Sequence, residues 1–247
     1  MLRTFLKFAL AGSLALLVVS LWLSEALPPP AELDSALLRE PIQRLAQERA
    51  FDTTVGGITY TVKPLYRYEI TGLVVSRHDA GSWRDVLHKD WNDKLNVADI
   101  CVVWGHNANT GIYRNLSFWN GQFTCNWEAP SMEAYEGFDE TAISNNHLLT
   151  ANTHTARRIR EARVGDQIRM TGMLAEYSHN HGFPFKRGTS ITRSDTGNGA
   201  CETIYVEDFS ILKTGGGPWR SLRWVAGVLL FLSLLGWFFQ PPRFDHT

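Results

Sequence analysis

The sequence has almost no excess charge of either sign. Its 24 Lys and Arg residues balance 25 Asp and Glu residues, which leaves a formal net charge of −1. A chain this close to neutrality sets up no long-range field that would collect a polyanion, so nucleic acid is not expected as a partner. Cysteine is also scarce, at three residues in 247, and the Cys and His residues show none of the spacings typical of zinc modules.

Two long uncharged apolar runs stand out instead, one near each end of the sequence. The first runs from Phe8 to Ser24 and follows Arg3 and Lys7. A helix needs about 20 apolar residues to cross a bilayer, and the apolar residues before Phe8 extend the run to that length. Positive charges ahead of a first helix stay in the cytoplasm, so the chain beyond this run is predicted to be exported.

The fate of residues 1–26 has two interpretations. Ser24 and Ala26 place small side chains at the −3 and −1 positions of a possible signal-peptidase cut. A cleaved signal peptide and a retained anchor therefore both stay open. The run continues through Trp22 and Leu23, which is long for a signal peptide and favours the anchor.

The second run, over residues 224–242, ends in two prolines. Trp219, Trp224 and Trp237 lie near its ends, where indole rings settle at lipid headgroups. A buried core helix is the alternative, but no later segment could cover it. We predict a second transmembrane helix here, preceded by a linker over residues 213–223.

One exported domain is predicted between the two runs. Residues 27–64 read as a linker with short helices, because prolines at 28–30 stiffen its start and Pro41 interrupts the helical spacing. Alternating apolar and polar residues then predict a mostly β domain over residues 65–212. Its expected strands cover 65–75, 99–104, 118–128, 167–177 and 202–212. Asn120-Gly121 predicts a hairpin within the third strand, and either Asn152 or Thr153 can cap a helix that continues to Arg163.

The order of these elements resembles the OB-fold. The helix falls between strands three and four, Val164-Gly165-Asp166 leads into a strand broken at Gly172, and the last strand ends in Val-Glu-Asp-Phe-Ser-Ile-Leu. The resemblance implies a five-stranded Greek-key barrel that binds ligands across strands two and three and the adjoining loops. The long spans 79–96 and 130–149 depart from a minimal barrel.

A second resemblance concerns the source and the location. The segments 101–105, 144–148 and 195–202 are similar to an uncharacterised group of exported bacterial proteins. The similarity implies a bacterial inner-membrane protein with a periplasmic domain, and it implies no activity.

An oxidising compartment permits one disulfide among the three cysteines and leaves one thiol over. We expect Cys125 to pair with Cys201, leaving Cys101 buried in a strand; three unpaired cysteines are the alternative. Each cysteine lies in or beside an expected strand, where buried thiols are usually inert, so no cysteine nucleophile is predicted.

Two motifs suggest a hydrolase. Asp195-Thr196-Gly197 matches the aspartic-protease signature, but it occurs once and follows polar residues, as a turn does. His179 and His181 could place two imidazoles on one side of a strand for zinc, but a third ligand would have to come from elsewhere, such as His106 or His147. A solvated pair of loop histidines is the favoured interpretation of this motif, so no metal or other cofactor is expected.

Polar clusters at strand ends are the remaining candidates for a site. They could line a ligand groove, or they could satisfy buried backbone groups in long loops. Their residues are His106, Asn107, Asn145, Asn146 and His147, together with Asp195 and Asn198 in the turn.

The sequence as a whole predicts a non-catalytic binding or assembly module. It would be tethered to the lipid bilayer and would dock to another envelope or inner-membrane protein. An exported hydrolase, at Asp195 or at His179 and His181, is the first alternative. A nucleic-acid-binding OB-fold is the second, suggested by the arginines of the 152–163 helix and opposed by the exported location.

Overall fold

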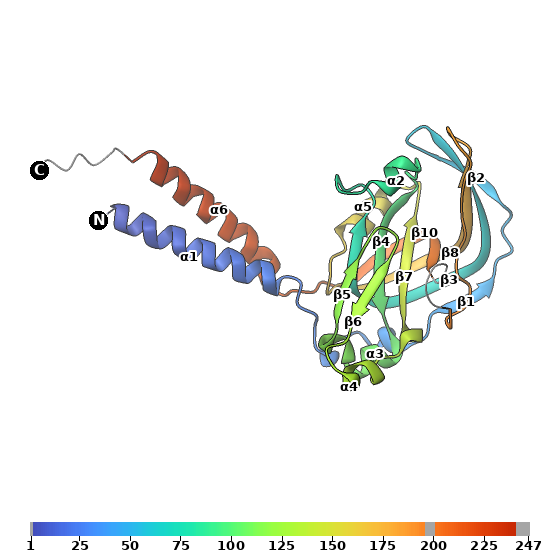
Figure 1. Cartoon of the computed structure of the whole chain (residues 1–247), viewed down its shortest axis with the longest axis horizontal. Coiled ribbons are helices and arrows are strands. Elements are labelled where there is room, and N and C mark those ends of the chain that lie inside the picture. Colours follow the sequence, from blue (N-terminus) through green and yellow to red (C-terminus); the bar gives the residue numbers. More distant parts are fainter. Residues whose placement is uncertain (1, 196–200, 241–247) are drawn as a thin grey trace, which may run out of the picture. The chain divides into compact units, whose positions relative to one another are not determined.

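The computed structural model describes residues 2–195 and 201–240 and divides into two units (Figure 1). Two helices, α1 (Leu2–Leu23) and α6 (Trp219–Phe238), form the first unit together with the residues around them. Residues 27–214 form the second unit, which contains every strand of the described residues.

Helices α1 and α6 pack against each other in opposite directions. The Arg3 Nε atom near the start of α1 donates to Gln240 Oε1 beyond the end of α6, at 3.0 Å. The residues buried in the two helices are mostly small: Ser13 and Ser20 on α1 and Ala226 and Ser233 on α6, together with Leu6. Small residues at such contacts allow close approach of two helices.

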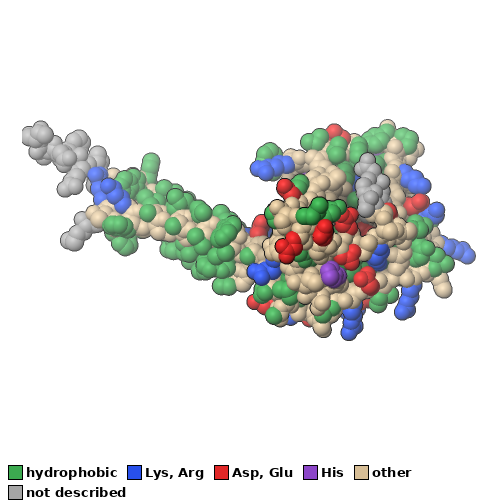
Figure 2. Space-filling view, turned by 60° about the horizontal axis from the view of Figure 1, so that its bottom comes forward, with side chains coloured by type: hydrophobic (Ala, Val, Ile, Leu, Met, Phe, Trp, Pro, Cys, Tyr) green, Lys and Arg blue, Asp and Glu red, His purple; other side chains and the backbone are tan. Residues whose placement is uncertain are grey.

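The outer sides of both helices are apolar and exposed, as Figure 2 shows over the helix pair. Only 17% of the apolar window of α1 and 11% of that of α6 is buried, unlike the core helix of a soluble protein. By length and composition both are able to cross a membrane. Helix α6 begins at Trp219, inside the segment that the sequence predicts as a linker.

The second unit is built mainly from one eight-stranded sheet and a separate two-stranded hairpin. The sheet consists of β1 (Ile42–Leu45), β2 (Phe51–Val55), β3 (Ile58–Asp79), β4 (Asn96–Val103), β7 (Ile143–Leu149), β8 (Gln167–His179), β9 (Phe185–Arg187) and β10 (Glu202–Lys213). The hairpin consists of β5 (Ser117–Asn120) and β6 (Cys125–Glu128). The short α-helices are α2 (Leu87–Asp90), α3 (Gly105–Thr110), α4 (Met132–Glu136) and α5 (Thr153–Glu161).

Five strands of the sheet pair in a cycle. Strand β3 pairs with β4, β4 with β7, β7 with β10, β10 with β8, and β8 again with β3. The β7–β10 pairing is parallel, and the other four are antiparallel. The hydrogen-bonded pairing of these five strands therefore returns to the strand at which it starts. Strands β1 and β2 pair with β3, and β9 pairs with β8, outside this cycle.

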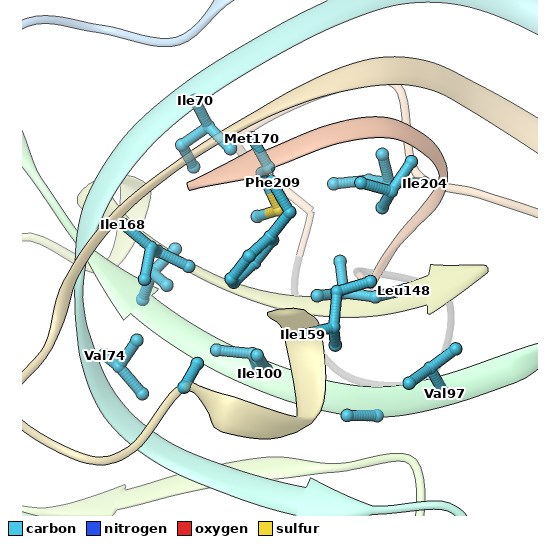
Figure 3. Close-up of a cluster of buried hydrophobic side chains, with 14 of the residues drawn as sticks. Ile70, Val74, Val97, Ile100, Leu148, Ile159, Ile168, Met170, Ile204 and Phe209 are labelled. Atoms are coloured by element: carbon cyan, nitrogen blue, oxygen red, sulfur yellow. The ribbon is translucent and has the colours of Figure 1, made fainter. Parts of the chain in front are cut away.

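The main hydrophobic core lies on the inner face of these five strands. Figure 3 shows side chains from several of them converging, with Ile159 of α5 among them. Gly172 makes the close packing of β8 on β10 possible, because a Cβ atom there would lie 2.1 Å from the Tyr205 carbonyl oxygen. The break predicted at this glycine is thus a close backbone approach.

Helix α5 and the last strand agree with the sequence. The Asn152 side chain accepts from the His154 and Thr155 amides and caps α5, as predicted. Strand β10 shifts register between Val206 and Asp208, where its alternation is offset.

Three expectations about the strands are wrong. Residues 42–45 form β1 instead of helix, because they pair in antiparallel register with residues 66–69 along one edge of β3. Strand β3 begins at Ile58, so the β domain starts before residue 65. The third strand of the cycle is β7, whereas residues 118–128 form the β5–β6 hairpin outside the main sheet.

The disulfide joins Cys101 to Cys125, not Cys125 to Cys201. Cys101 lies on the face of β4 that the β5–β6 hairpin covers, and the two Cα atoms are 5.9 Å apart. The bond ties the hairpin to the main sheet and leaves Cys201 as a free, partly exposed thiol.

We expect Cys125→Ser to lower the free energy of unfolding by about 3 kcal/mol, because the bond closes a loop with a sequence separation of 24. Urea unfolding of the full chain in detergent measures the change. Cys201→Ser keeps the disulfide and is the matched control, with a much smaller loss expected. A Cys125–Cys201 peptide in a non-reduced digest would contradict the pairing.

Candidate functional site

A cleft of about 860 Å³ opens beside the free thiol. Its walls come from the β5–β6 hairpin, from β7, and from the segment between β9 and β10. Phe123, Asn145, Arg187 and Cys201 line it, and Trp91 contributes from the segment between β3 and β4. The cleft therefore gathers residues that lie more than 100 positions apart in the sequence.

Strand alternation decides which polar residues reach this region. Asp99 pairs with His147 across β4 and β7, and Cys101 pairs with Asn145. These pairs lie on the face opposite the main core, since partners in register share a face. Asn146, between the two polar residues of β7, points the other way and donates to the Ile100 carbonyl at 3.1 Å. The predicted cluster of Asn145, Asn146 and His147 thus splits between two faces.

Asp99 and His147 form a buried pair. His147 Nδ1 lies 2.6 Å from Asp99 Oδ1, and both side chains are fully buried. Burial opposes the charged form of Asp99, but the charge and hydrogen bond of His147 outweigh it and lower the pKa of Asp99 to about 2. Burial likewise opposes protonation of His147, and Asp99 overcomes this and raises the pKa of His147 to about 9.

Cys201 lies directly before β10, next to His147. Its Sγ atom accepts from Asn145 Nδ2 at 3.5 Å and donates to the Phe123 carbonyl oxygen at 3.7 Å. Burial acts to raise the pKa of Cys201, but the contact with His147 prevails and lowers it. The thiol is therefore partly accessible and is easier to ionise than an ordinary cysteine.

Arg187 and Phe123 complete the surroundings of His147. The Arg187 Nη2 atom lies 2.7 Å from His147 Nε2, and its guanidinium is 4.1 Å from the centroid of the Phe123 ring. Phe123 has a φ of 65°, a conformation that is unfavourable for a bulky residue. Its backbone amide donates to Asp99 Oδ2 at 3.1 Å, which helps to hold this conformation.

Both ring nitrogens of His147 face a partner. Nδ1 lies 2.6 Å from Asp99 Oδ1, and Nε2 lies 2.7 Å from Arg187 Nη2. When the ring is neutral, its proton is on Nδ1 toward Asp99, and Nε2 accepts from Arg187. The charge of Asp99 favours protonation of the ring, and the charge of Arg187 opposes it.

Other predicted site residues lie outside this arrangement. His106 is exposed on α3. Asn107 is buried and holds the segment before β7, because its amide donates to the carbonyls of Asp139 and Ala142 and its oxygen accepts from the Asp139 amide. Asn107 therefore satisfies the hydrogen-bonding groups of buried loop backbone, which is one of the two roles that the sequence leaves open for this cluster.

The hydrolase motifs do not assemble as their chemistry requires. Asp195 lines the cleft, and its carboxylate accepts from Ser190 Oγ at 2.6 Å. Asn198 lies outside the described residues, as do Thr196 and Gly197. His179 contacts the Trp91 carbonyl through Nε2 and accepts from the His181 amide through Nδ1, so neither nitrogen is free for a metal.

The sequence interpretation missed Asp99, Arg187 and Cys201 as one group. The sequence feature that points to this group is Asp99, because a carboxylate inside the apolar strand 96–103 requires a buried partner. Its partner His147 is 48 residues away, so only the strand pairing reveals the contact.

The arrangement has the parts of an activated nucleophile. Cys201 supplies the thiolate, His147 stabilises it, and Asp99 fixes the ring of His147. The Asn145 amide lies next to the sulfur and Arg187 lines the same cleft, and both can donate to a developing oxyanion.

No family model, curated protein or solved structure matches this chain.

We expect His147→Gln to raise the pKa of Cys201 and to slow its alkylation by iodoacetamide at pH 7 about tenfold, since one pKa unit changes the thiolate fraction tenfold. Asp99→Asn should slow alkylation in the same direction. The rate is measured against pH in the full chain, where the disulfide leaves only Cys201 to react. His106→Gln, on an exposed histidine, is the matched control, and equal profiles for all variants would contradict the assigned contact.

Proposed function

We propose that α1 and α6 anchor this chain in the inner membrane of a bacterium and that the β domain lies in the periplasm. Three observations support the location: the exposed apolar surfaces of both helices, the positive charges of Arg3 and Lys7, and the disulfide, which suits an oxidising compartment.

Alkaline phosphatase inserted at the exposed Met132 is expected to be active in intact bacteria, because this reporter works only outside the cytosol. The same reporter fused after Thr247 should be inactive, because an even number of crossings returns the end to the cytosol. An inactive insertion at Met132, with the full-length protein present, would refute the placement.

We further propose that the five cyclically paired strands are an OB-like barrel. Strands β3, β4, β7, β8 and β10 would be strands one to five, with α5 between three and four. In this numbering Asn145 lies on strand three, Trp91 in the loop between strands one and two, and Arg187 between strands four and five. OB-folds bind their ligands across this combination of surfaces, and the cleft occupies it.

The function best supported by the site is cysteine-dependent acyl transfer in the cleft. The single observation that carries the proposal is the position of the partly exposed Cys201 beside His147 of the fully buried His147–Asp99 pair, a neighbour that lowers the pKa of the thiol. The thiolate would attack a carbonyl carbon, forming a carbon–sulfur bond as the bond from that carbon to the leaving group breaks, and the leaving group would take a proton from water in the cleft. Water or a second acceptor would then release the acyl group and restore the thiol.

His147 acts here as the group that holds the thiolate. It is fully buried and does not line the cleft, so it reaches the substrate only through the sulfur and its immediate surroundings. Asp99 is a positioning residue, because it touches His147 and not the cleft.

A non-catalytic binding or assembly module is the second candidate. The cleft itself favours it, because aromatic side chains from Trp91, Phe123 and Trp127 line it beside the charged Lys186 and Arg187. Such a surface fits a docking role toward another envelope or inner-membrane protein.

A reactive ester separates the two candidates. We expect 4-nitrophenyl acetate to acylate Cys201 of the full chain in detergent, as detected by peptide mass spectrometry, and Cys201→Ala to lose the adduct. His147→Gln should form the adduct about tenfold more slowly at pH 7, in proportion to its lower thiolate fraction. His106→Gln is the control with unchanged rate.

Absence of a Cys201 adduct in folded protein would refute the acyl-transfer proposal. Crosslinking in intact membranes, followed by mass spectrometry, then tests the binding module. If the Cys201→Ala variant crosslinks to the same specific neighbour as the unmodified chain, the result supports a binding role that needs no reaction at the thiol. Recovery of no specific neighbour would count against the binding module.

A further inference from the structure

A second group of polar side chains lies in the segment between β3 and β4, outside the thiol site. His78 is at the end of β3, Asp85 is in the connecting loop, and His88 is in the first turn of α2. One nitrogen from each histidine and one oxygen of Asp85 all lie within 4.8 Å of one another. Within residues 2–195 and 201–240, no other three His, Cys, Asp or Glu side chains converge in this way.

One carboxylate oxygen contacts both imidazoles. Asp85 Oδ2 is 2.6 Å from His78 Nε2 and 2.6 Å from His88 Nδ1. The two rings flank it and are nearly parallel, with an interplanar angle of 19°. The other oxygen of Asp85 accepts from the His88 backbone amide at 2.9 Å, which fixes the carboxylate between the rings.

The cluster is enclosed on all but one side. Asp85 is fully buried, His88 is 2% exposed, and His78 is 16% exposed. A buried carboxylate facing two imidazoles is a costly arrangement unless each group is paired, and a divalent cation pairs all three at once.

We propose that His78, Asp85 and His88 bind a divalent transition-metal ion of the Zn²⁺ type. Two imidazole nitrogens and one carboxylate oxygen are the ligand set of a three-ligand zinc site, which leaves a fourth position for water. The solvent-facing side at His78 supplies that position.

The spacing suits zinc after a small adjustment. Ligands about 2.0–2.1 Å from a tetrahedral ion lie about 3.3 Å from each other. The 2.6 Å contacts of Asp85 must therefore lengthen slightly, whereas the nitrogen–nitrogen separation, within 4.8 Å, must close. Asp85 lies in a loop, which can make this movement more easily than a paired strand.

Neighbouring carboxylates and amides support the site. Binding through Nδ1 moves the His88 proton to Nε2, which is 4.0 Å from Asp93 Oδ2, so the carboxylate must come closer to accept it. Asn96 Nδ2 lies 2.8 Å from His88 Nε2 and donates to Asp99 Oδ1, so this amide donor must move when Nε2 carries the proton. The metal site would thus adjoin the polar network behind Cys201.

The position of the site suggests its role. Residues 80–95 carry Trp91, which lines the cleft and stacks on Phe123 with ring centroids 5.0 Å apart. A metal held by His78 on β3 and by Asp85 and His88 within this segment would tie the segment to the sheet and order the wall of the cleft that Trp91 forms.

Metal titration of the full chain in detergent tests the proposal. Cys201→Ser is used as the parent, so that the thiol and His147 cannot supply a competing zinc site and the outcome does not depend on acyl transfer. We expect the parent to bind about one Zn²⁺ per chain after dialysis, as expected for a single three-ligand site. Co²⁺ should give the visible absorption of a tetrahedral nitrogen- and oxygen-ligated ion.

His88→Ala in this parent should weaken Zn²⁺ binding at least tenfold, and Asp85→Asn should weaken it similarly. His106→Ala and His154→Ala remove exposed histidines elsewhere and are the matched controls, with unchanged binding expected. Folded His88→Ala protein that binds Zn²⁺ like the parent would overturn the proposal.

Circular dichroism and thermal melting show whether the variants fold. If they do not, the parent protein still decides the question, because Zn²⁺ should raise its melting temperature and the chelator EDTA should reverse the rise. A parent with no bound Co²⁺ absorption and no Zn²⁺-dependent rise would equally overturn the site.

Discussion

The buried carboxylate of Asp99 is the interaction on which the organisation of the cleft depends. Its two oxygens accept from His147 on β7, from the Asn96 amide and from the backbone of Phe123 beside the β5–β6 hairpin. A single charge inside an apolar strand thus fixes three separate parts of the chain. Removing it would leave His147 buried without its counter-charge, which costs far more than an exposed ion pair does.

The same pair that compensates the burial of Asp99 also determines the surroundings of the thiol. The contact with Asp99 fixes the ring of His147, and this neighbouring ring lowers the pKa of Cys201. The thiol itself stays at the wall of the cleft and out of the disulfide, which joins the hairpin to β4 instead. Because the geometry pairs Cys125 with Cys101, Cys125 is not available to form a disulfide with Cys201.

The sequence predicts the elements whose signals are local. Run length and lack of charge indicate both terminal helices, Asn152 marks the start of α5, and Asn120-Gly121 marks the hairpin. The elements it misses depend on distant partners. Residues of β7 read as a polar cluster because Asn145 lines the cleft and His147 is paired with the buried Asp99, and only their pairing with β4 shows that they belong to a strand. The predicted disulfide is wrong for the same reason. Three cysteines allow several pairings, and their spacing in the sequence does not indicate which pair forms.

The opposed directions of α1 and α6 have a consequence for how the ends of the chain are arranged. Arg220 Nε lies 3.3 Å from the Ser24 carbonyl, so the chain leaves the first helix close to where it enters the second. At the opposite end of the pair, Arg3 meets Gln240. The start of α1 at Leu2 and the residues that follow α6 up to Gln240 therefore lie at the same end of the helix pair.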